Sequence, residues 1–169
     1  LNKAYPKTLT GNVNLYVDRS NGSDDNTCVN GAVFRSLQSA INSIPKFMNG
    51  RVVYIHLQSA VYENVDFAYF SSGRIFLLLH GYTLYGYIHG YHMSAALVIY
   101  GGTQNDTTIG TIHPSNAIDG GNRSNSIAMN ACRLLLISNV NLYAPDNQYS
   151  GYSGYKQGIA CHTSGYAYI

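Results

Sequence analysis

Tyrosine offers the clearest binding chemistry in this sequence, because a phenol ring combines a flat apolar face with a hydroxyl group at a small entropic cost on binding. Two groups stand out among the 16 tyrosines: Tyr82, Tyr85, Tyr87 and Tyr91, then Tyr149, Tyr152 and Tyr155. For most of them we favour packing between chain segments or between chains. The second group lies in a polar stretch, and loops on a rigid scaffold commonly carry binding. Tyr149, Tyr152 and Tyr155 are therefore the candidates for glycan contact.

Paired carboxylates, which glycoside hydrolysis requires about 5 to 10 Å apart, are harder to find. Asp106 and Asp119 could meet only across a polar loop, and Asp146 lies in a Pro-Asp-Asn turn. Glu63 stands alone beside a predicted strand, so we expect it to be a turn residue or the partner of a surface arginine. Its expected partners are Arg51 and Arg74. The sequence thus predicts no catalytic residue, and an enzyme is kept as an alternative.

No set of potential ligands follows a metal-binding pattern. The oxygen-rich turn at 18–26 lacks the EF-hand spacing, so a solvated turn is a better interpretation than a calcium loop. Four histidines are expected to be scattered over the surface: His80, His89, His92 and His113. The cysteines form no Cys-x-x-Cys pair and are predicted to be free, mostly buried thiols: Cys28, Cys132 and Cys161. No metal or cofactor is expected.

The charge of the chain is low and evenly spread. Charged residues make up 11% of the sequence, the net charge is +2, and no Lys/Arg cluster is present. This composition argues against nucleic-acid binding. The longest aliphatic or aromatic run, Ile75 to Leu79, is far too short to cross a bilayer, so no membrane insertion is expected.

Hydrophobic periodicity predicts one helix among many strands. Apolar residues at helical spacing predict a helix over 34–44, which Pro45 ends. A strand over 13–17 and a loop over 18–31 precede it. Strong apolar strands are predicted at 51–57, 74–80, 96–100 and 133–137, and weaker ones at 61–65, 82–85, 138–143, 158–161 and 166–169.

The strong strands recur at a nearly fixed interval. Val52, Ile75 and Leu97 follow one another after 23 and 22 residues, which is typical of a solenoid whose repeats bury their apolar faces on each other. Leu134 comes later, so we predict inserted loops at 103–125 and 144–157. The predicted organisation is a lead-in, strand and capping helix over 1–50, followed by coils over 51–169. Because the chain stops at Ile169 inside a predicted strand, we expect a longer chain or an assembly.

The entry to this repeat resembles a known family. The segment Phe34-Arg35-Ser36-Leu37-Gln38-Ser39-Ala40-Ile41-Asn42-Ser43-Ile44-Pro45, followed by Val61-Tyr62-Glu63-Asn64-Val65, is similar to the first turn of pectin-lyase-like proteins. The likeness covers about residues 13–67 and extends to phage tailspike or appendage proteins and to pectin methylesterases. It implies an all-β, right-handed parallel β-helix of about 22–23 residues per coil with a short N-terminal capping helix. The paired aspartates and the arginine that it implies for an esterase have no matching strand context here.

The expected function follows from the resemblance, the low charge and the tyrosine content. We expect a phage virion component, made in the host cytoplasm, with a structural and host-surface glycan-binding role. Its expected partners are identical chains in a homotrimer, other virion tail proteins and bacterial surface polysaccharide. Two alternatives stay open: a carbohydrate-active enzyme of the same fold (a polysaccharide lyase, hydrolase or methylesterase), and a bacterial adhesin at the cell surface or secreted.

Overall fold

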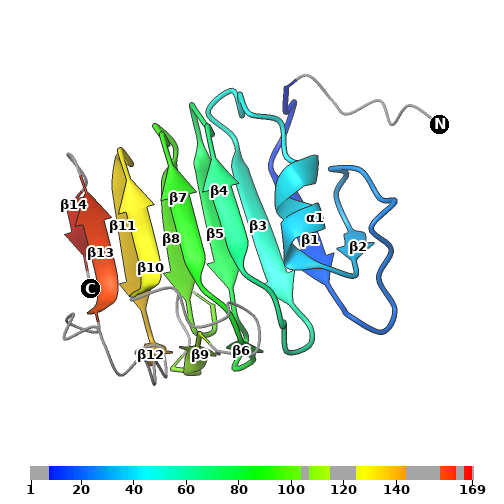
Figure 1. Ribbon diagram of the computed structural model, residues 1–169. Helices are drawn as coiled ribbons and strands as arrows, with labels where there is room; N and C mark the ends of the chain where they lie inside the picture. Colours follow the sequence, from blue (N-terminus) through cyan, green and yellow to red (C-terminus); the bar gives the residue numbers. More distant parts are fainter. Residues whose placement is uncertain (1–7, 104–106, 115–124, 144–156, 163–165, 169) are drawn as a thin grey trace.

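The regular secondary structure of the described residues consists of parallel β-strands and one short helix, which confirms the predicted all-β class (Figure 1). The computed structural model describes residues 8–103, 107–114, 125–143, 157–162 and 166–168. The long sheet contains β1 (Val13–Val17), β2 (Ala32–Phe34), β3 (Val52–Leu57), β5 (Arg74–Leu78), β8 (Ala96–Tyr100), β11 (Leu134–Ser138) and β14 (Tyr166–Tyr168). The four-stranded sheet contains β4 (Val65–Ala68), β7 (Ile88–Tyr91), β10 (Asn125–Asn130) and β13 (Gln157–His162). The three-stranded sheet contains β6 (Thr83–Leu84), β9 (Gly110–Ile112) and β12 (Val140–Leu142).

From β5 onward the chain visits the three sheets in a fixed order. A strand of the long sheet is followed by one of the three-stranded sheet and then by one of the four-stranded sheet, up to β14. Every pairing between these strands is parallel. The register aligns Val53, Ile75, Leu97 and Leu135. The predicted anchors Val52 and Leu134 are therefore wrong by one residue, because they lie one position before the residues that align with Ile75 and Leu97.

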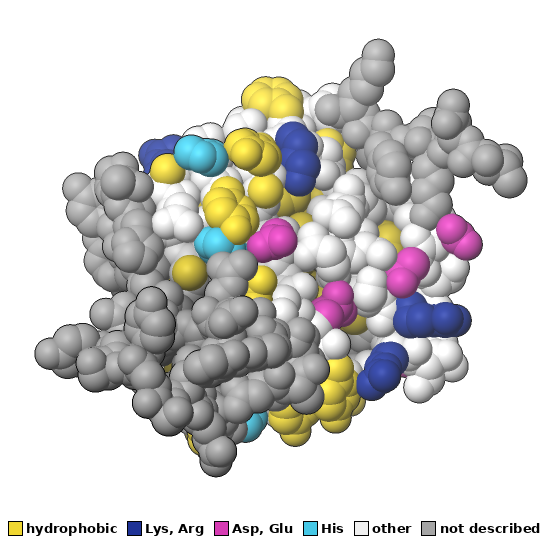
Figure 2. Space-filling model, in the orientation of Figure 1, with side chains coloured by type: hydrophobic (Ala, Val, Ile, Leu, Met, Phe, Trp, Pro, Cys, Tyr) yellow, Lys and Arg dark blue, Asp and Glu magenta, His cyan; other side chains and the backbone are white. Residues whose placement is uncertain are grey.

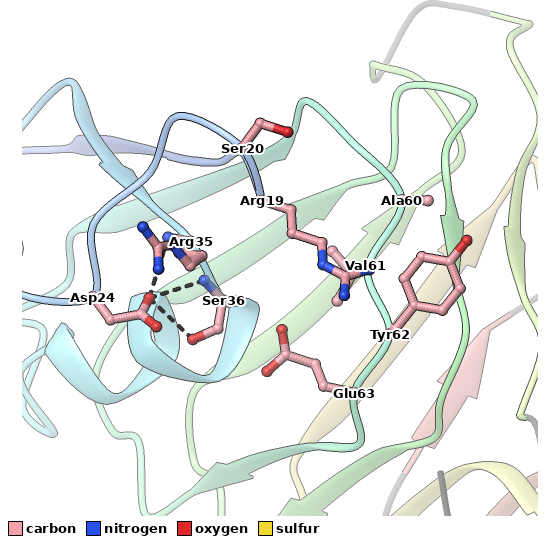
Figure 3. Close-up of a pocket in the computed structure, with 9 residues that line it drawn as sticks. All are labelled: Arg19, Ser20, Asp24, Arg35, Ser36, Ala60, Val61, Tyr62 and Glu63. Carbon is pink, nitrogen blue, oxygen red and sulfur yellow. Dashed lines mark hydrogen bonds between the residues drawn. The ribbon is translucent and has the colours of Figure 1, made fainter. Parts of the chain in front are cut away.

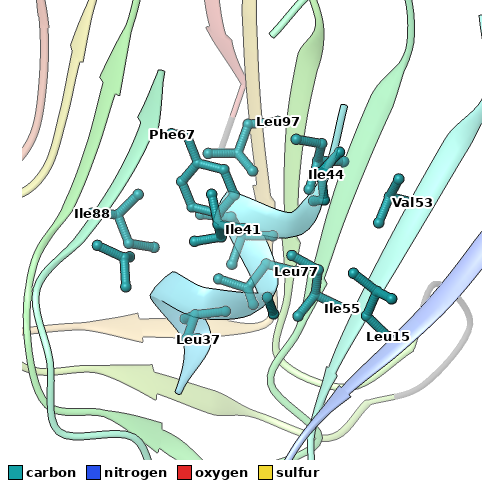
Figure 4. Close-up of a cluster of buried hydrophobic side chains, with 14 of the residues drawn as sticks. Leu15, Leu37, Ile41, Ile44, Val53, Ile55, Phe67, Leu77, Ile88 and Leu97 are labelled. Carbon is teal, nitrogen blue, oxygen red and sulfur yellow. The ribbon is translucent and has the colours of Figure 1, made fainter. Parts of the chain in front are cut away.

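Alternate side chains of the strands meet in one continuous core (Figure 4). Ile55 and Leu77 of the long sheet and Phe67 and Ile88 of the four-stranded sheet are fully buried. Leu84 and Ile112 of the three-stranded sheet also belong to this core. Each such side chain contributes about 1.5–3 kcal/mol relative to leaving it in water.

Helix α1 (Leu37–Ser43) lies at the N-terminal end of the row of strands (Figure 1). It is shorter than the predicted helix over 34–44, because Phe34 is the last residue of β2 and Ser36 is the N-cap. The Ser36 side chain accepts a hydrogen bond from the backbone N–H of Ser39 at 3.2 Å. Leu37 and Ile41 point into the core (Figure 4). The helix thus covers apolar side chains at this end of the molecule.

The weaker predicted strands need correction. Val61 forms only an isolated bridge to Leu84, and β4 begins at Val65, so the predicted strand over 61–65 is a corner between two sheets. The next corner is marked by residues of positive φ that follow the aligned ends of β4, β7 and β10: Tyr69 at 63°, His92 at 47° and Ala131 at 50°. Neither β2 nor this recurring left-handed corner follows from hydrophobic periodicity.

The predicted inserted loops fall largely outside the described residues. The loop over 103–125 is wrong as a continuous loop, because β9 lies within it and pairs with β6 and β12. Of the loop over 144–157 only Gln157 is described, as the first residue of β13. Cys28 and Cys132 are buried free thiols, as predicted. The described part of the chain holds no helix with the length and apolar character needed to span a bilayer.

Candidate functional site

A row of aromatic side chains runs along the outer side of the three-stranded sheet. Inward-facing residues of this sheet are aligned in register: Val61, Leu84, Ile112 and Leu142. The residue after each of them projects outward, because successive side chains alternate across a strand. These four residues, Tyr62, Tyr85, His113 and Tyr143, are called the aromatic row below.

The rings of the aromatic row are in contact from one end to the other. Tyr62 and Tyr85 stack with centroids 4.6 Å apart and planes 12° apart. His113 meets Tyr85 at 6.1 Å and Tyr143 at 4.9 Å, in both cases edge to face. Tyr62 and Tyr143, at the two ends, are 53% and 52% exposed. The spacing follows the distance of about 4.8 Å between neighbouring strands. The row is therefore a regular, partly exposed aromatic surface on a rigid support.

A pocket of about 370 Å³ opens at the Tyr62 end of the aromatic row (Figure 3). Two arginines, Arg19 and Arg35, two acidic residues, Asp24 and Glu63, and the Tyr62 ring line it together with small residues. The guanidinium carbon of Arg19 lies 5.1 Å from the centroid of Tyr62, which is a cation–π contact. The pocket and the row thus form one continuous surface, which we treat as the candidate site.

Both carboxylates of the pocket are engaged by the start of α1. The backbone N–H groups of Leu37 and Gln38 donate to Glu63 at 2.7 and 3.1 Å. Asp24 accepts hydrogen bonds from the backbone of Arg35 at 3.1 Å and from the backbone and hydroxyl of Ser36 at 2.9 and 3.1 Å. Burial raises the pKa of Glu63, although the two N–H donors oppose this shift. The prediction that Glu63 pairs with an arginine is wrong, because the carboxylate completes the cap of the helix instead.

A second polar cluster lies on the outer side of the four-stranded sheet. His89 is only 5% exposed, which contradicts its predicted surface position. Its Nδ1 lies 2.5 Å from the Tyr91 hydroxyl and 3.7 Å from a carboxylate oxygen of Asp66, and its Nε2 lies 3.0 Å from the Asn130 amide nitrogen. Both ring nitrogens therefore have polar neighbours, which is how a buried histidine is accommodated.

The other histidines also have aromatic or polar partners. The Nε2 atom of His80 lies 2.9 Å from the Nδ1 atom of His56. The Nε2 atom of His56 lies 3.1 Å from the side-chain oxygen of Asn14. His92 stacks on Tyr69 with centroids 5.6 Å apart. In the ranges that the structure describes, no group of three or more His, Cys, Asp or Glu side chains is arranged to hold a metal ion. The turn at 18–26 uses Asp18 to bind its own backbone at Ser20 and Asn21.

The predicted glycan-contact residues and the observed row differ. Tyr149, Tyr152 and Tyr155 lie outside the described residues, so that prediction stays open. The earlier tyrosine group is divided: Tyr85 belongs to the aromatic row, Tyr87 and Tyr91 contact His89, and Tyr82 is 40% exposed. A sequence signal for the row exists in hindsight: an aliphatic residue followed by an aromatic one recurs as Val-Tyr, Leu-Tyr, Ile-His and Leu-Tyr.

Comparison with known proteins adds no relative. The chain has no significant match to a protein-family model, to a curated protein or to a solved structure. The function of this chain is therefore inferred from the geometry of the site and from the resemblance of the entry segment.

Proposed function

We propose that the three sheets form a right-handed parallel β-helix of the pectin-lyase-like kind. The fixed order in which the chain visits the sheets supports this proposal, as does the alignment of Val53, Ile75, Leu97 and Leu135. In such a helix one coil contributes one strand to each sheet, and the apolar interior continues from coil to coil. Helix α1 then caps the first coil.

We further propose that the protein binds a host-surface polysaccharide through the aromatic row, as a segment of a phage tailspike, fibre or appendage. The observation that carries this proposal is the continuous contact from Tyr62 to Tyr143 along the direction in which the strands stack. One aromatic group per coil recurs at a spacing close to the length of a hexose unit. An extended glycan lying along the row would therefore meet an aromatic group at each sugar.

The site favours binding over hydrolysis. Hydrolysis of a glycosidic bond needs a carboxylic acid on one side of that bond and a free carboxylate on the other side. Asp24 and Glu63 are the acidic residues that line the pocket, and each is held by backbone N–H groups at the start of α1. These hydrogen bonds give the two carboxylates a structural role, while the outward-facing edges and hydroxyls of the tyrosines in the row are positioned to meet a ligand.

The test is polysaccharide binding by variants of the aromatic row. Affinity electrophoresis against a panel of capsular and cell-wall polysaccharides is expected to detect a ligand, and Tyr62→Ala and Tyr143→Ala are each expected to weaken binding about three- to tenfold. Tyr69→Ala is the matched control, because Tyr69 is 62% exposed and also stacks on a histidine, but lies at another corner. Equal effects of all three substitutions would refute the assignment of the site.

The assembly has its own test. Light scattering of the purified protein is expected to give a homotrimer, as in a trimeric tailspike. A stable monomer that binds no polysaccharide of the panel would argue against the virion role as a whole.

A further inference from the structure

The Arg19 side chain extends into the pocket at the end of the aromatic row. Figure 3 shows it reaching toward Tyr62 and Glu63, while Arg35 and Asp24 lie on the far side of the pocket. Its guanidinium carbon lies 5.1 Å from the centroid of the Tyr62 ring, and its backbone N–H donates a hydrogen bond to the Ser59 hydroxyl. Among the described residues, no carboxylate lies within ion-pair distance of the Arg19 guanidinium.

The acidic residues of the pocket do not compete strongly for this cation. Glu63 is hydrogen-bonded to the backbone of Leu37 and Gln38, and Asp24 to that of Arg35 and Ser36. The charged group that influences the pKa of Glu63 is Asp24, not an arginine. The donors of the Arg19 guanidinium therefore remain directed at the pocket volume.

A planar guanidinium beside an aromatic ring has a defined preference. It presents parallel N–H donors that match the two oxygens of a carboxylate or the oxygens of a sulfate or phosphate. The contact with the Tyr62 ring restricts the Arg19 side chain, so less conformational entropy is lost when an anion binds. A neutral sugar hydroxyl would satisfy one donor and leave the charge unpaired.

We infer that the sugar unit lying against Tyr62 carries an anionic group, which Arg19 binds from inside the pocket with Arg35 on the opposite wall. This inference rests on the proposed function, since it names the ligand class of the same site. It predicts an acidic polysaccharide as the ligand, with the anion at the N-terminal end of the aromatic row.

The experiment compares acidic polysaccharides with their own neutral forms. The probes are alginate, hyaluronan and xanthan, each before and after chemical reduction of the carboxyl groups, together with dextran sulfate against dextran. The unaltered protein is expected to bind at least one acidic form about tenfold more tightly than its neutral form. Arg19→Gln is expected to abolish that preference, so that the acidic and neutral forms bind with similar affinity. Arg51→Gln, an exposed arginine outside the pocket, is the control for general attraction to polyanions.

The outcomes separate this inference from the proposed function. Preference for a carboxylate probe or for dextran sulfate identifies which anion the pocket takes. If Tyr62→Ala weakens binding while acidic and neutral forms bind equally, the inference is wrong and glycan binding stands. Equal losses for Arg19→Gln and Arg51→Gln also overturn it, because the attraction is then not located in the pocket. Binding of no probe, acidic or neutral, overturns both.

Discussion

Replacing one of two adjacent leucines by alanine tests the inside–outside alternation on which the fold depends. Leu77 is fully buried in the core and is aligned between Ile55 and Ile99. Leu78, the next residue, is 5% exposed but lies outside the core cluster, on the outer side of the long sheet. The two positions share side chain, strand and near-complete burial, so they differ mainly in which side of the sheet they occupy.

The expected cost at Leu77 is large because its surroundings cannot close over the gap. Truncation of a buried leucine costs about 2–5 kcal/mol, and the cost rises with the volume of the cavity that remains. Hydrogen bonds to strands on both sides hold the backbone of β5, which places Leu77→Ala at about 4 kcal/mol. At Leu78 solvent and neighbouring side chains can fill the space, so Leu78→Ala is expected to cost about 1–2 kcal/mol.

The assay is urea unfolding followed by tyrosine fluorescence and far-UV circular dichroism. Both variants are expected to keep the slope of the wild-type transition, so that the difference lies in the midpoint. Equal losses at the two positions, or a greater loss at Leu78, would refute the assignment of the core to one side of the long sheet.

Three further predictions follow. A Cβ on Gly86 would lie 1.9 Å from the carbonyl oxygen of Glu63, so Gly86→Ala is expected to lower the free energy of unfolding by more than about 3 kcal/mol in urea unfolding. Gly11→Ala is the control and is expected to be neutral, because a Cβ on Gly11 would have no atom within 4 Å. Burial lowers the pKa of His56, and the nearby His80 lowers it further, so the unfolded chain binds a proton more readily than the folded chain. The urea midpoint is therefore expected to fall as the pH drops below about 6.5, and His80→Gln is expected to make that fall smaller. Burial raises the pKa of Cys28 to about 11, so we expect iodoacetamide at pH 8 to leave this thiol unmodified in the native protein and to alkylate it in urea. Mass spectrometry measures the modification, and rapid alkylation of the native protein would contradict the burial of Cys28.

Local patterns in the sequence are sufficient for the strong strands and for the helix. The run Ala96–Tyr100 is apolar along its whole length, and Val52–Leu57 is apolar except for His56. Their β-branched and aromatic residues favour strands. The helix is recognisable because the spacing of Leu37, Ala40 and Ile41 fits the helical period and Pro45 stops it. Both features depend on residues that are close in the chain.

The short strands and the corners are poorly predicted, because their conformation is set by neighbours that are distant in sequence. Two residues of β6 form a strand only because Val61 and β9 align with them. Tyr69, His92 and Ala131 adopt a left-handed backbone that their own side chains do not favour, and the stacked corner determines it.

The sequence by itself determined that the chain is rich in parallel-type strands with a nearly fixed repeat, has one amphipathic helix and carries little charge. The tertiary structure decided which polar and aromatic side chains meet. Tyr62 and Tyr143 lie 81 positions apart in the chain and join one row only when the strands stack in register. Likewise, Glu63 holds the start of the helix because folding brings it beside Leu37. Such contacts depend on how segments that are distant in the chain align across the sheets, since a slip of one residue would turn each side chain to the other face.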